Sequence, residues 1–395
     1  MRTSLLTLIL LPLAVFTQDP ITIHRELPRW EDLLSDWNMI YPGEETQCLY
    51  GTPYAFFVKP GKSEDVFISF PGGGACWSGL TCSNEPTGRL DMGPKTISID
   101  DVPSNGGIFS SQPINPFSDF THIHIGYCTG DMHMGGNSIA NDSPLPENQG
   151  YPRLNFNGYN NAKKALVWLL EQNHSIKKLV VGGFTSGSYG TPIYVHMLKE
   201  LLPETEIYHI GDGIGAIHLD DKVQPLLEAW GTDIILDEYP DMKYGLPSPY
   251  QFNDLIVAAG TLHPEVTMTQ IISANDRVFS ELVDYLESDF DISEIIRSSQ
   301  DYINLRIPNF RSFTLGGDAH VLGLGHLFSV ENPGNSNMGL PTIYDRFFSM
   351  GINNISYSQW VTNLIENKSI NSMSCVNCEK TEIIPINPIS FEIDR

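Results

Sequence analysis

One stretch of the chain has the residue types and spacing of a hydrolytic nucleophile. Gly183-Phe184-Thr185-Ser186-Gly187 follows an apolar run at 179–181 and precedes a helical pattern. Strand, Gly-x-nucleophile-x-Gly, helix is the layout of a nucleophile elbow, in which the two glycines permit a sharp turn and close packing. The apex residue here is threonine where such elbows usually carry serine. The other interpretation is an ordinary strand-to-helix turn.

Asp276 and His320 have the positions expected of a catalytic acid and base. Each follows a predicted strand, and ligands of open α/β sheets bind at the carboxyl ends of the strands. The histidine would take the proton of the nucleophile, and the aspartate would orient the imidazole. Asp212, which also closes a strand, is the alternative acid, and His326 is the alternative base. Asp276 is also open to interpretation as the N-cap of the helix that follows it.

Two polar or glycine-rich loops are candidates to surround the nucleophile. The loop 71–77, Pro-Gly-Gly-Gly-Ala-Cys-Trp, follows a strong apolar strand. A glycine-rich turn there allows backbone N–H groups to converge as an oxyanion hole, although it could also be a plain flexible loop. The loop 127–136 is dense in polar groups. Trp77, Thr129 and Asp131 are the candidates to line the pocket.

These candidates require a sheet whose strands alternate with helices. We expect an α/β fold of the α/β-hydrolase type, with a mostly parallel sheet covered by helices on both faces. Residues 18–395 are expected to form one domain, with a small cap from 221–262. An irregular lead-in with one short helix is expected up to about residue 42, and an irregular surface loop is expected at 137–157. The predicted strands are 50–58, 65–70, 121–128, 179–181, 206–210, 267–273 and 310–315. The predicted helices are 30–37, 158–172, 188–202, 277–287 and 291–304.

The N-terminus and the cysteines indicate secretion. Residues 1–17 contain one arginine and a short apolar run, which is typical of a signal peptide and too short to span a bilayer. Six cysteines in a secreted chain are expected to pair. Spacing predicts Cys76–Cys82 and Cys375–Cys378, which leaves Cys48–Cys128. Glycosylation is expected at four sequons, Asn141, Asn173, Asn354 and Asn367.

The net charge argues against nucleic acid and anionic membranes as partners, and the spacing of the strand histidines argues against a metal ion. The formal net charge is −24, so the surface should repel nucleic acid and anionic membranes. His122 and His124 share one strand face and could bind a metal, but no third ligand accompanies them, so no metal is expected. The sequence does not predict an oligomeric state.

Several motifs together resemble one family of esterases. They are Cys48–Tyr54, Gly72–Trp77 with Cys82, Tyr127–Asp131, Gly316–His320 and Cys375–Cys378. From about residue 48 to 378 the chain is similar to the pectin acetylesterase and Notum family. That resemblance implies an α/β-hydrolase fold and ester hydrolysis without metal or cofactor. It also implies a small ester, or an acetylated or acylated polymer, as substrate.

The resemblance also implies roles for particular residues. The nucleophile position falls on Thr185, the acid on Asp276 and the base on His320. The oxyanion donors fall on the N–H groups of Gly73, Gly74 and Ser186. Because a β-branched residue is disfavoured at a strained apex, two functions stay open. The chain is either a secreted carboxylic-ester hydrolase acting through Thr185, or a family member that binds its ligand without turnover.

Overall fold

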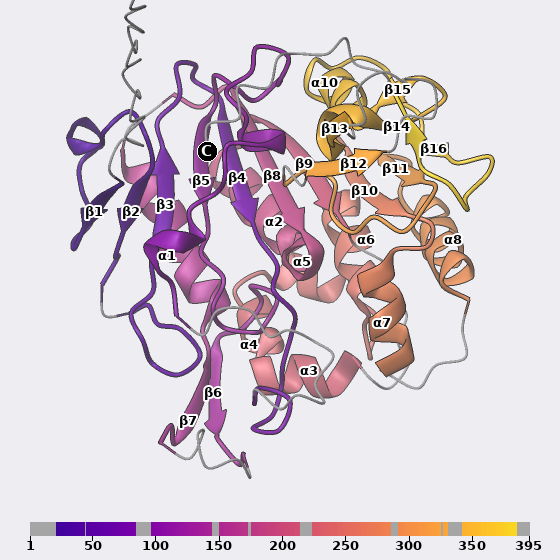
Figure 1. Cartoon of the computed structure of the whole chain (residues 1–395). Helices are drawn as coiled ribbons and strands as arrows, with labels where there is room; N and C mark the ends of the chain where they lie inside the picture. The colour runs from indigo at the N-terminus through magenta and orange to yellow at the C-terminus, as the bar shows by residue number, and fades with distance from the viewer. Residues whose placement is uncertain are drawn as a thin grey trace, which may run out of the picture.

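The chain folds around one long, mostly parallel sheet (Figure 1). The computed structural model describes residues 21–43, 45–83, 96–143, 150–172, 175–213, 223–285, 291–324, 327–330 and 342–384. In spatial order the strands are β1 (Thr22–His24), β2 (Asn38–Ile40), β3 (Phe56–Lys59), β5 (Thr121–His124), β4 (Val66–Phe70), β8 (Lys178–Phe184), β9 (Glu206–Asp212), β10 (Met268–Ser273), β11 (Phe310–Leu315) and β16 (Met373–Ser374). Every pair from β5 to β16 is parallel, whereas β3 pairs antiparallel with both β2 and β5.

The central strands are buried, which explains their apolar sequences. All five residues of β4 are buried, as are six of the seven residues of β8. Strands covered on both faces need apolar side chains at successive positions rather than in alternation. β8 lies between β4 and β9, so the segment that carries Thr185 leaves the middle of the sheet.

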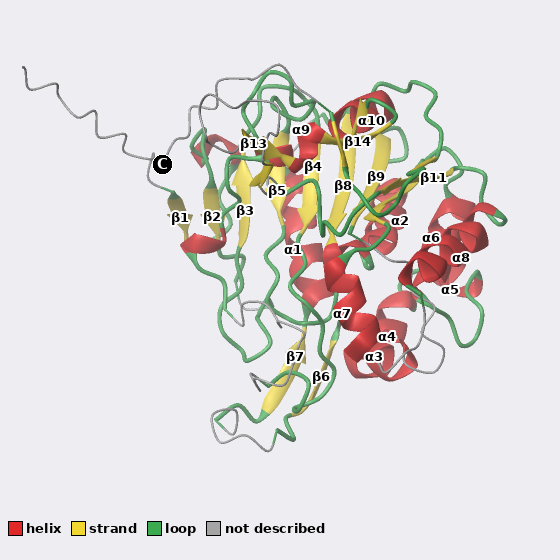
Figure 2. Ribbon diagram, turned by 45° about the vertical axis from the view of Figure 1, so that its right-hand side comes forward, coloured by secondary structure: helices red, strands yellow, loops and turns green. Residues whose placement is uncertain are grey.

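Helices surround this sheet, and three small separate sheets lie beside it (Figures 1 and 2). The α-helices are α1 (Gly158–Glu171), α2 (Thr191–Leu201), α3 (Val223–Trp230), α4 (Thr232–Leu236), α5 (Pro240–Tyr244), α6 (Phe252–Leu262), α7 (Arg277–Tyr285), α8 (Ile292–Asn304), α9 (Arg346–Ser349) and α10 (Tyr357–Ile365). The smaller sheets pair β6 (Asn137–Ala140) with β7 (Arg153–Phe156), β12 (Leu327–Val330) with β13 (Thr342–Asp345), and β14 (Met350–Ile352) with β15 (Ile355–Ser356) and β17 (Glu382–Ile383). None of the helices in the described residues is long and apolar enough to cross a membrane.

Three segments differ from the sequence-based expectation. The N-terminal lead-in contributes β1 and β2 to the sheet edge, and only the short 3₁₀ helix Trp30–Asp32 forms where a longer helix was expected. The predicted irregular loop 137–157 contains the β6–β7 hairpin, which projects from one end of the molecule (Figures 1 and 2). Within 221–262, α6 packs against α2 and α8, so this helix is part of the main helical layer rather than a cap.

Three disulfides join the cysteines in the pairs expected from their spacing. Cys48–Cys128 spans 80 residues, Cys76–Cys82 spans 6 and Cys375–Cys378 spans 3. The first bridge is buried and links the segment before β3 to the loop after β5. It therefore fixes the loop 127–136 to the N-terminal edge of the sheet.

Candidate active site

The elbow forms where β8 ends, and Thr185 occupies its apex. Strand β8 passes into a 3₁₀ turn, Thr185–Ser188, and then into α2. Thr185 has a φ of 48°, a left-handed conformation that is strained for a β-branched residue. A Cβ at Gly183 would lie 2.4 Å from Ser188 Cα, and one at Gly187 would lie 2.1 Å from Phe70 O. Glycine is therefore required on both sides of the apex.

The Thr185 side chain lies against the glycine-rich loop. A Cβ built on Gly72 would be 1.8 Å from Thr185 Cγ2, so the methyl group sits directly over the Gly72 backbone. Among the described residues, no hydrogen bond joins the Thr185 hydroxyl to His320. The hydroxyl is thus at the apex of the turn, but its direction is not fixed by the expected base.

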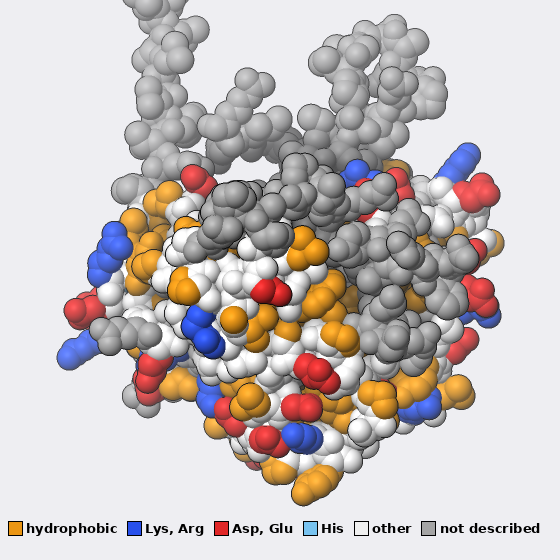
Figure 3. Space-filling model, turned by 90° about the horizontal axis from the view of Figure 1, so that it is seen from below, with side chains coloured by type: hydrophobic (Ala, Val, Ile, Leu, Met, Phe, Trp, Pro, Cys, Tyr) orange, Lys and Arg blue, Asp and Glu red, His pale blue; other side chains and the backbone are white. Residues whose placement is uncertain are grey.

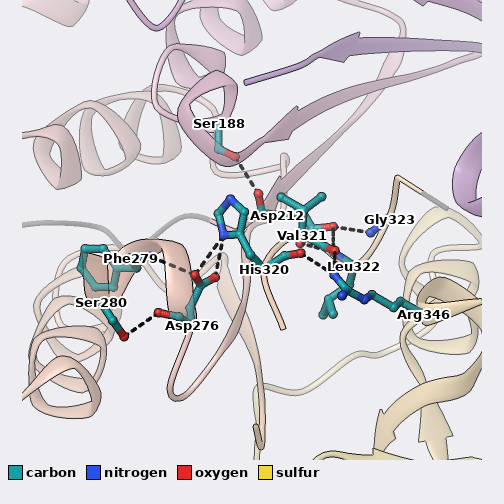
Figure 4. A network of polar contacts seen from close by, with 10 residues as sticks. All are labelled: Ser188, Asp212, Asp276, Phe279, Ser280, His320, Val321, Leu322, Gly323 and Arg346. Carbon is teal, nitrogen blue, oxygen red and sulfur yellow. Dashed lines mark hydrogen bonds and ion pairs between the residues drawn. The ribbon is translucent and has the colours of Figure 1, made fainter. Parts of the chain in front are cut away.

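His320 and Asp276 form a close pair after β11 and β10 (Figure 4). His320 Nδ1 is 2.9 Å from each carboxylate oxygen of Asp276, and the other ring nitrogen points away from that carboxylate. Since a carboxylate only accepts hydrogen bonds, Nδ1 carries the proton and Nε2 is left as the basic nitrogen. Asp276 also accepts from the Phe279 N–H, so it begins α7 as well as orienting the histidine.

Asp212, the alternative acid, bonds to backbone rather than to the imidazole. Its carboxylate accepts from the N–H groups of Leu322 and Gly323, and it is fully buried. Burial raises the pKa of Asp212 to about 7, although the two hydrogen bonds from Leu322 and Gly323 act to lower it. Asp212 therefore holds the turn that follows His320, in which Val321 has a φ of 51°. His326, the alternative base, lies outside the described residues.

Arg346 is a supporting residue that no local motif indicated. Its guanidinium donates to the carbonyl oxygen of His320 at 2.8 Å (Figure 4). It lies 26 residues further along the chain, at the start of α9. Only the folded chain brings it to the histidine, so sequence spacing held no signal for it.

The glycine-rich loop carries candidate oxyanion donors. Gly73 and Gly74 have φ values of 152° and 83°, and the Gly73 N–H donates to Ser186 Oγ at 3.1 Å. Tyr127 fixes the same loop by donating its hydroxyl to Gly74 O at 2.7 Å. Within the described chain, no hydrogen bond engages the N–H groups of Gly74 and Ser186. These two groups therefore remain candidates to bind a developing negative charge.

The candidate pocket residues have different roles. Asp131 is fully buried and accepts from Thr129 Oγ1 and from the N–H groups of His133 and Gly158. These bonds fix the loop after β5 to the start of α1, and burial raises the pKa of Asp131 to about 6. Thr129 and Asp131 therefore support the loop. Trp77 is half-buried, and its role as a pocket residue stays a prediction.

His122 and His124 each have an ordinary structural partner. His122 Nε2 lies 3.1 Å from Phe117 O, and His124 Nδ1 lies 2.8 Å from Ser69 Oγ. Burial lowers their pKa values to about 4 and about 3. Both imidazoles are thus neutral side chains of the core.

The sheet order, the elbow after β8 and the turns after β10 and β11 define an α/β-hydrolase fold. The family model described as pectinacetylesterase matches residues 35–222, which confirms the predicted resemblance to that family. The match includes the elbow and the glycine-rich loop, whereas Asp276 and His320 follow it. It supports an esterase-type hydrolase.

A solved structure shares the fold over most of both chains. The Wnt deacylase Notum from Drosophila covers 85% of this chain and 94% of its own, with a TM-score of 0.53 and 14% identity. At that identity the likeness concerns the fold. No curated protein matches the chain.

Proposed function

We propose that the chain is a secreted carboxylic-ester hydrolase in which Thr185 is the nucleophile. The observation that carries this proposal is the His320–Asp276 pair, at 2.9 Å, beside an elbow in the middle of the sheet. His320 Nε2 takes the Thr185 proton as Oγ1 attacks the ester carbonyl carbon. The N–H groups of Gly74 and Ser186 bind the oxyanion.

The two half-reactions follow from the same groups. Collapse of the tetrahedral intermediate breaks the ester C–O bond, and His320 returns the proton to the departing alcohol. Water then attacks the acyl-threonine, again with His320 as base, and releases the acid. The substrate is a small ester or an acetylated or acylated polymer, as the family resemblance suggests.

The proposal includes secretion and glycosylation. Three disulfides favour an oxidising compartment. The predicted signal peptide, 1–17, and the sequon at Asn173 lie outside the described residues. Asn354 is exposed and is the preferred glycan site, because the side-chain amide of Asn367 donates to Glu206 and that of the half-buried Asn141 donates to Tyr151 O.

A second candidate function is ligand binding without turnover. It is favoured by the strained φ of Thr185 and by the position of its methyl group over Gly72. A family member of this kind would keep the glycine-rich loop and the His320–Asp276 pair and would bind an ester, glycan or protein.

Hydrolysis of aryl acetates and longer aryl esters separates the two functions. Wild type should turn over at least one ester, and His320→Ala should reduce kcat/KM by at least about a thousandfold. His24→Ala is the matched control, because His24 lies in β1 at the far edge of the sheet. A folded wild type that matches His320→Ala on every ester would favour the binding function.

A further inference from the structure

Two buried histidines face each other away from the candidate active site. His196 lies in α2 and His263 ends α6, and the two helices pack side by side (Figure 1). The side chains are 1% and 7% exposed. His196 Nδ1 is 2.8 Å from His263 Nε2. His196 lies about 7.5 Å along the α2 axis from Thr191, the first residue of that helix, at the rise of a helical residue.

The outer nitrogen of each ring faces a carboxylate. His196 Nε2 is 3.2 Å from Asp241 Oδ1, and His263 Nδ1 is 3.9 Å from Glu265 Oε1. A carboxylate that accepts the outer N–H fixes the tautomer and leaves the inner nitrogen as a lone pair. Protons on both outer nitrogens would place two lone pairs at one point, which a shared proton or a metal ion can bridge. Carboxylate–histidine–metal arrangements in proteins have this form.

Glu200 supplies a third ligand from the same helix. It follows His196 by four residues, which places the two side chains on one helix face. One ligand atom from each of His196, Glu200 and His263 lies within 4.8 Å of the other two. Glu200 is exposed and therefore provides the side of the cluster that solvent reaches.

The surrounding charges favour a divalent ion. Lys199, which precedes Glu200, forms an ion pair with Glu265, with Nζ 3.3 Å from Oε1, so its positive charge is compensated there. The chain as a whole carries a net charge of −24. Two imidazole nitrogens and one carboxylate oxygen form a ligand set that zinc prefers, with a fourth position for water.

We propose that His196, His263 and Glu200 bind a zinc ion that fastens α2 to the end of α6. Ligand atoms of a tetrahedral zinc site lie roughly 3.3 Å apart, so binding should separate the two facing nitrogens by about 0.5 Å. The ion takes the place of the proton that otherwise links the rings. The site acts on the helix behind the elbow and takes no part in ester hydrolysis.

Metal titration of tag-free, chelator-treated protein tests the site. Competition with a chromogenic chelator should show about one zinc bound per chain, and Co²⁺ should give the visible absorption of a four-coordinate site. Glu200→Gln should weaken zinc binding at least about tenfold, and His263→Gln should abolish it. Glu204→Gln is the matched control, because Glu204 is an exposed carboxylate on the turn after α2 and is not a ligand. Its affinity should equal that of wild type.

Zinc should also raise the Tm of wild type and leave that of His263→Gln unchanged. A chain that binds no stoichiometric zinc, or binds it equally well after Glu200→Gln, would overturn the proposal. In the first case the rings would share a proton. Neither outcome depends on esterase activity, so the zinc site and the proposed function succeed or fail separately.

Discussion

At the scale of single residues, Thr185 determines how well the site can work. Its hydroxyl is placed where an elbow places a nucleophile, but its branched Cβ is held at a φ of 48° and its methyl group covers Gly72. A serine at the apex keeps Oγ and removes the group that restricts its rotation. The same change leaves the N–H groups of the loop where they are.

We therefore expect Thr185→Ser to raise kcat/KM on an activated aryl ester at least about tenfold. A misplaced catalytic group costs two to four powers of ten in rate, or roughly 3–5 kcal/mol, which leaves room for that gain. Steady-state kinetics of wild type, Thr185→Ser and Thr185→Ser with His320→Ala would measure it. The gain should vanish in the double variant. A folded Thr185→Ser protein with no gain would favour the binding function.

The sequence predicted the parts of the site that follow local patterns. Glycines flank the apex, and Asp276 and His320 each follow an apolar strand, so spacing alone pointed to them. The bond that Arg346 donates to His320 depends on segments that meet only in the fold, and so do the bonds that Leu322 and Gly323 donate to Asp212. Composition did not distinguish Asp131 as a supporting residue, because two of its partners are backbone N–H groups, which every sequence offers.

At the scale of elements, long buried strands were predictable and short edge strands were not. β8 contains the apolar run Leu179–Val181 and β10 is buried at all six positions, whereas β1 and β2 have three residues each. Three residues are too few to show the alternation of polar and apolar side chains that marks a strand. These strands form because the neighbouring strand offers hydrogen bonds. The Cys48–Cys128 bridge anchors this side of the sheet.

The bridges should differ in their contribution to stability according to the chain they enclose. In the chain-entropy model, the 80-residue loop of Cys48–Cys128 corresponds to about 4.5 kcal/mol and the 3-residue loop of Cys375–Cys378 to about 1.6 kcal/mol. Replacing each pair by alanine should therefore destabilise the chain unequally. Urea unfolding of the two double variants would measure the difference. Equal free energies of unfolding would contradict the enclosed-loop explanation.

At the scale of the whole molecule, an acidic surface surrounds a core that contains neutral histidines. Figure 3 shows charged side chains of both signs scattered among apolar ones on one face. Inside, burial lowers the pKa of His122 and His133 to about 4, and of His124 and His209 to about 3. The unfolded chain binds protons at these groups near pH 6.5, well before the folded chain does.

Stability should therefore fall as the pH drops below 6.5 towards 4. Asp131 and Asp212 act in the opposite direction, because their raised pKa values of about 6 and about 7 make the folded chain bind protons first. Histidines with lowered pKa values, His263 among them, outnumber carboxyls with raised ones, Asp345 among them, so a net loss of roughly 2–3 kcal/mol per pH unit is expected near pH 5. Urea unfolding from pH 4.5 to 7 would measure the slope. His209→Gln should make the slope shallower, by on the order of 1 kcal/mol per pH unit, and an unchanged slope would contradict this assignment.

The position of the Cys48–Cys128 bridge also bears on how the chain matures as it is made. By residue 128 the strands β3, β4 and β5 have been synthesised, together with four of the six cysteines. Four cysteines allow three pairings, whereas six allow fifteen. At roughly 5–20 residues per second, β8 emerges several seconds later, and Cys375 and Cys378 later still. The order of synthesis thus separates the cysteines in time, and the N-terminal edge of the sheet can be oxidised before the elbow strand exists.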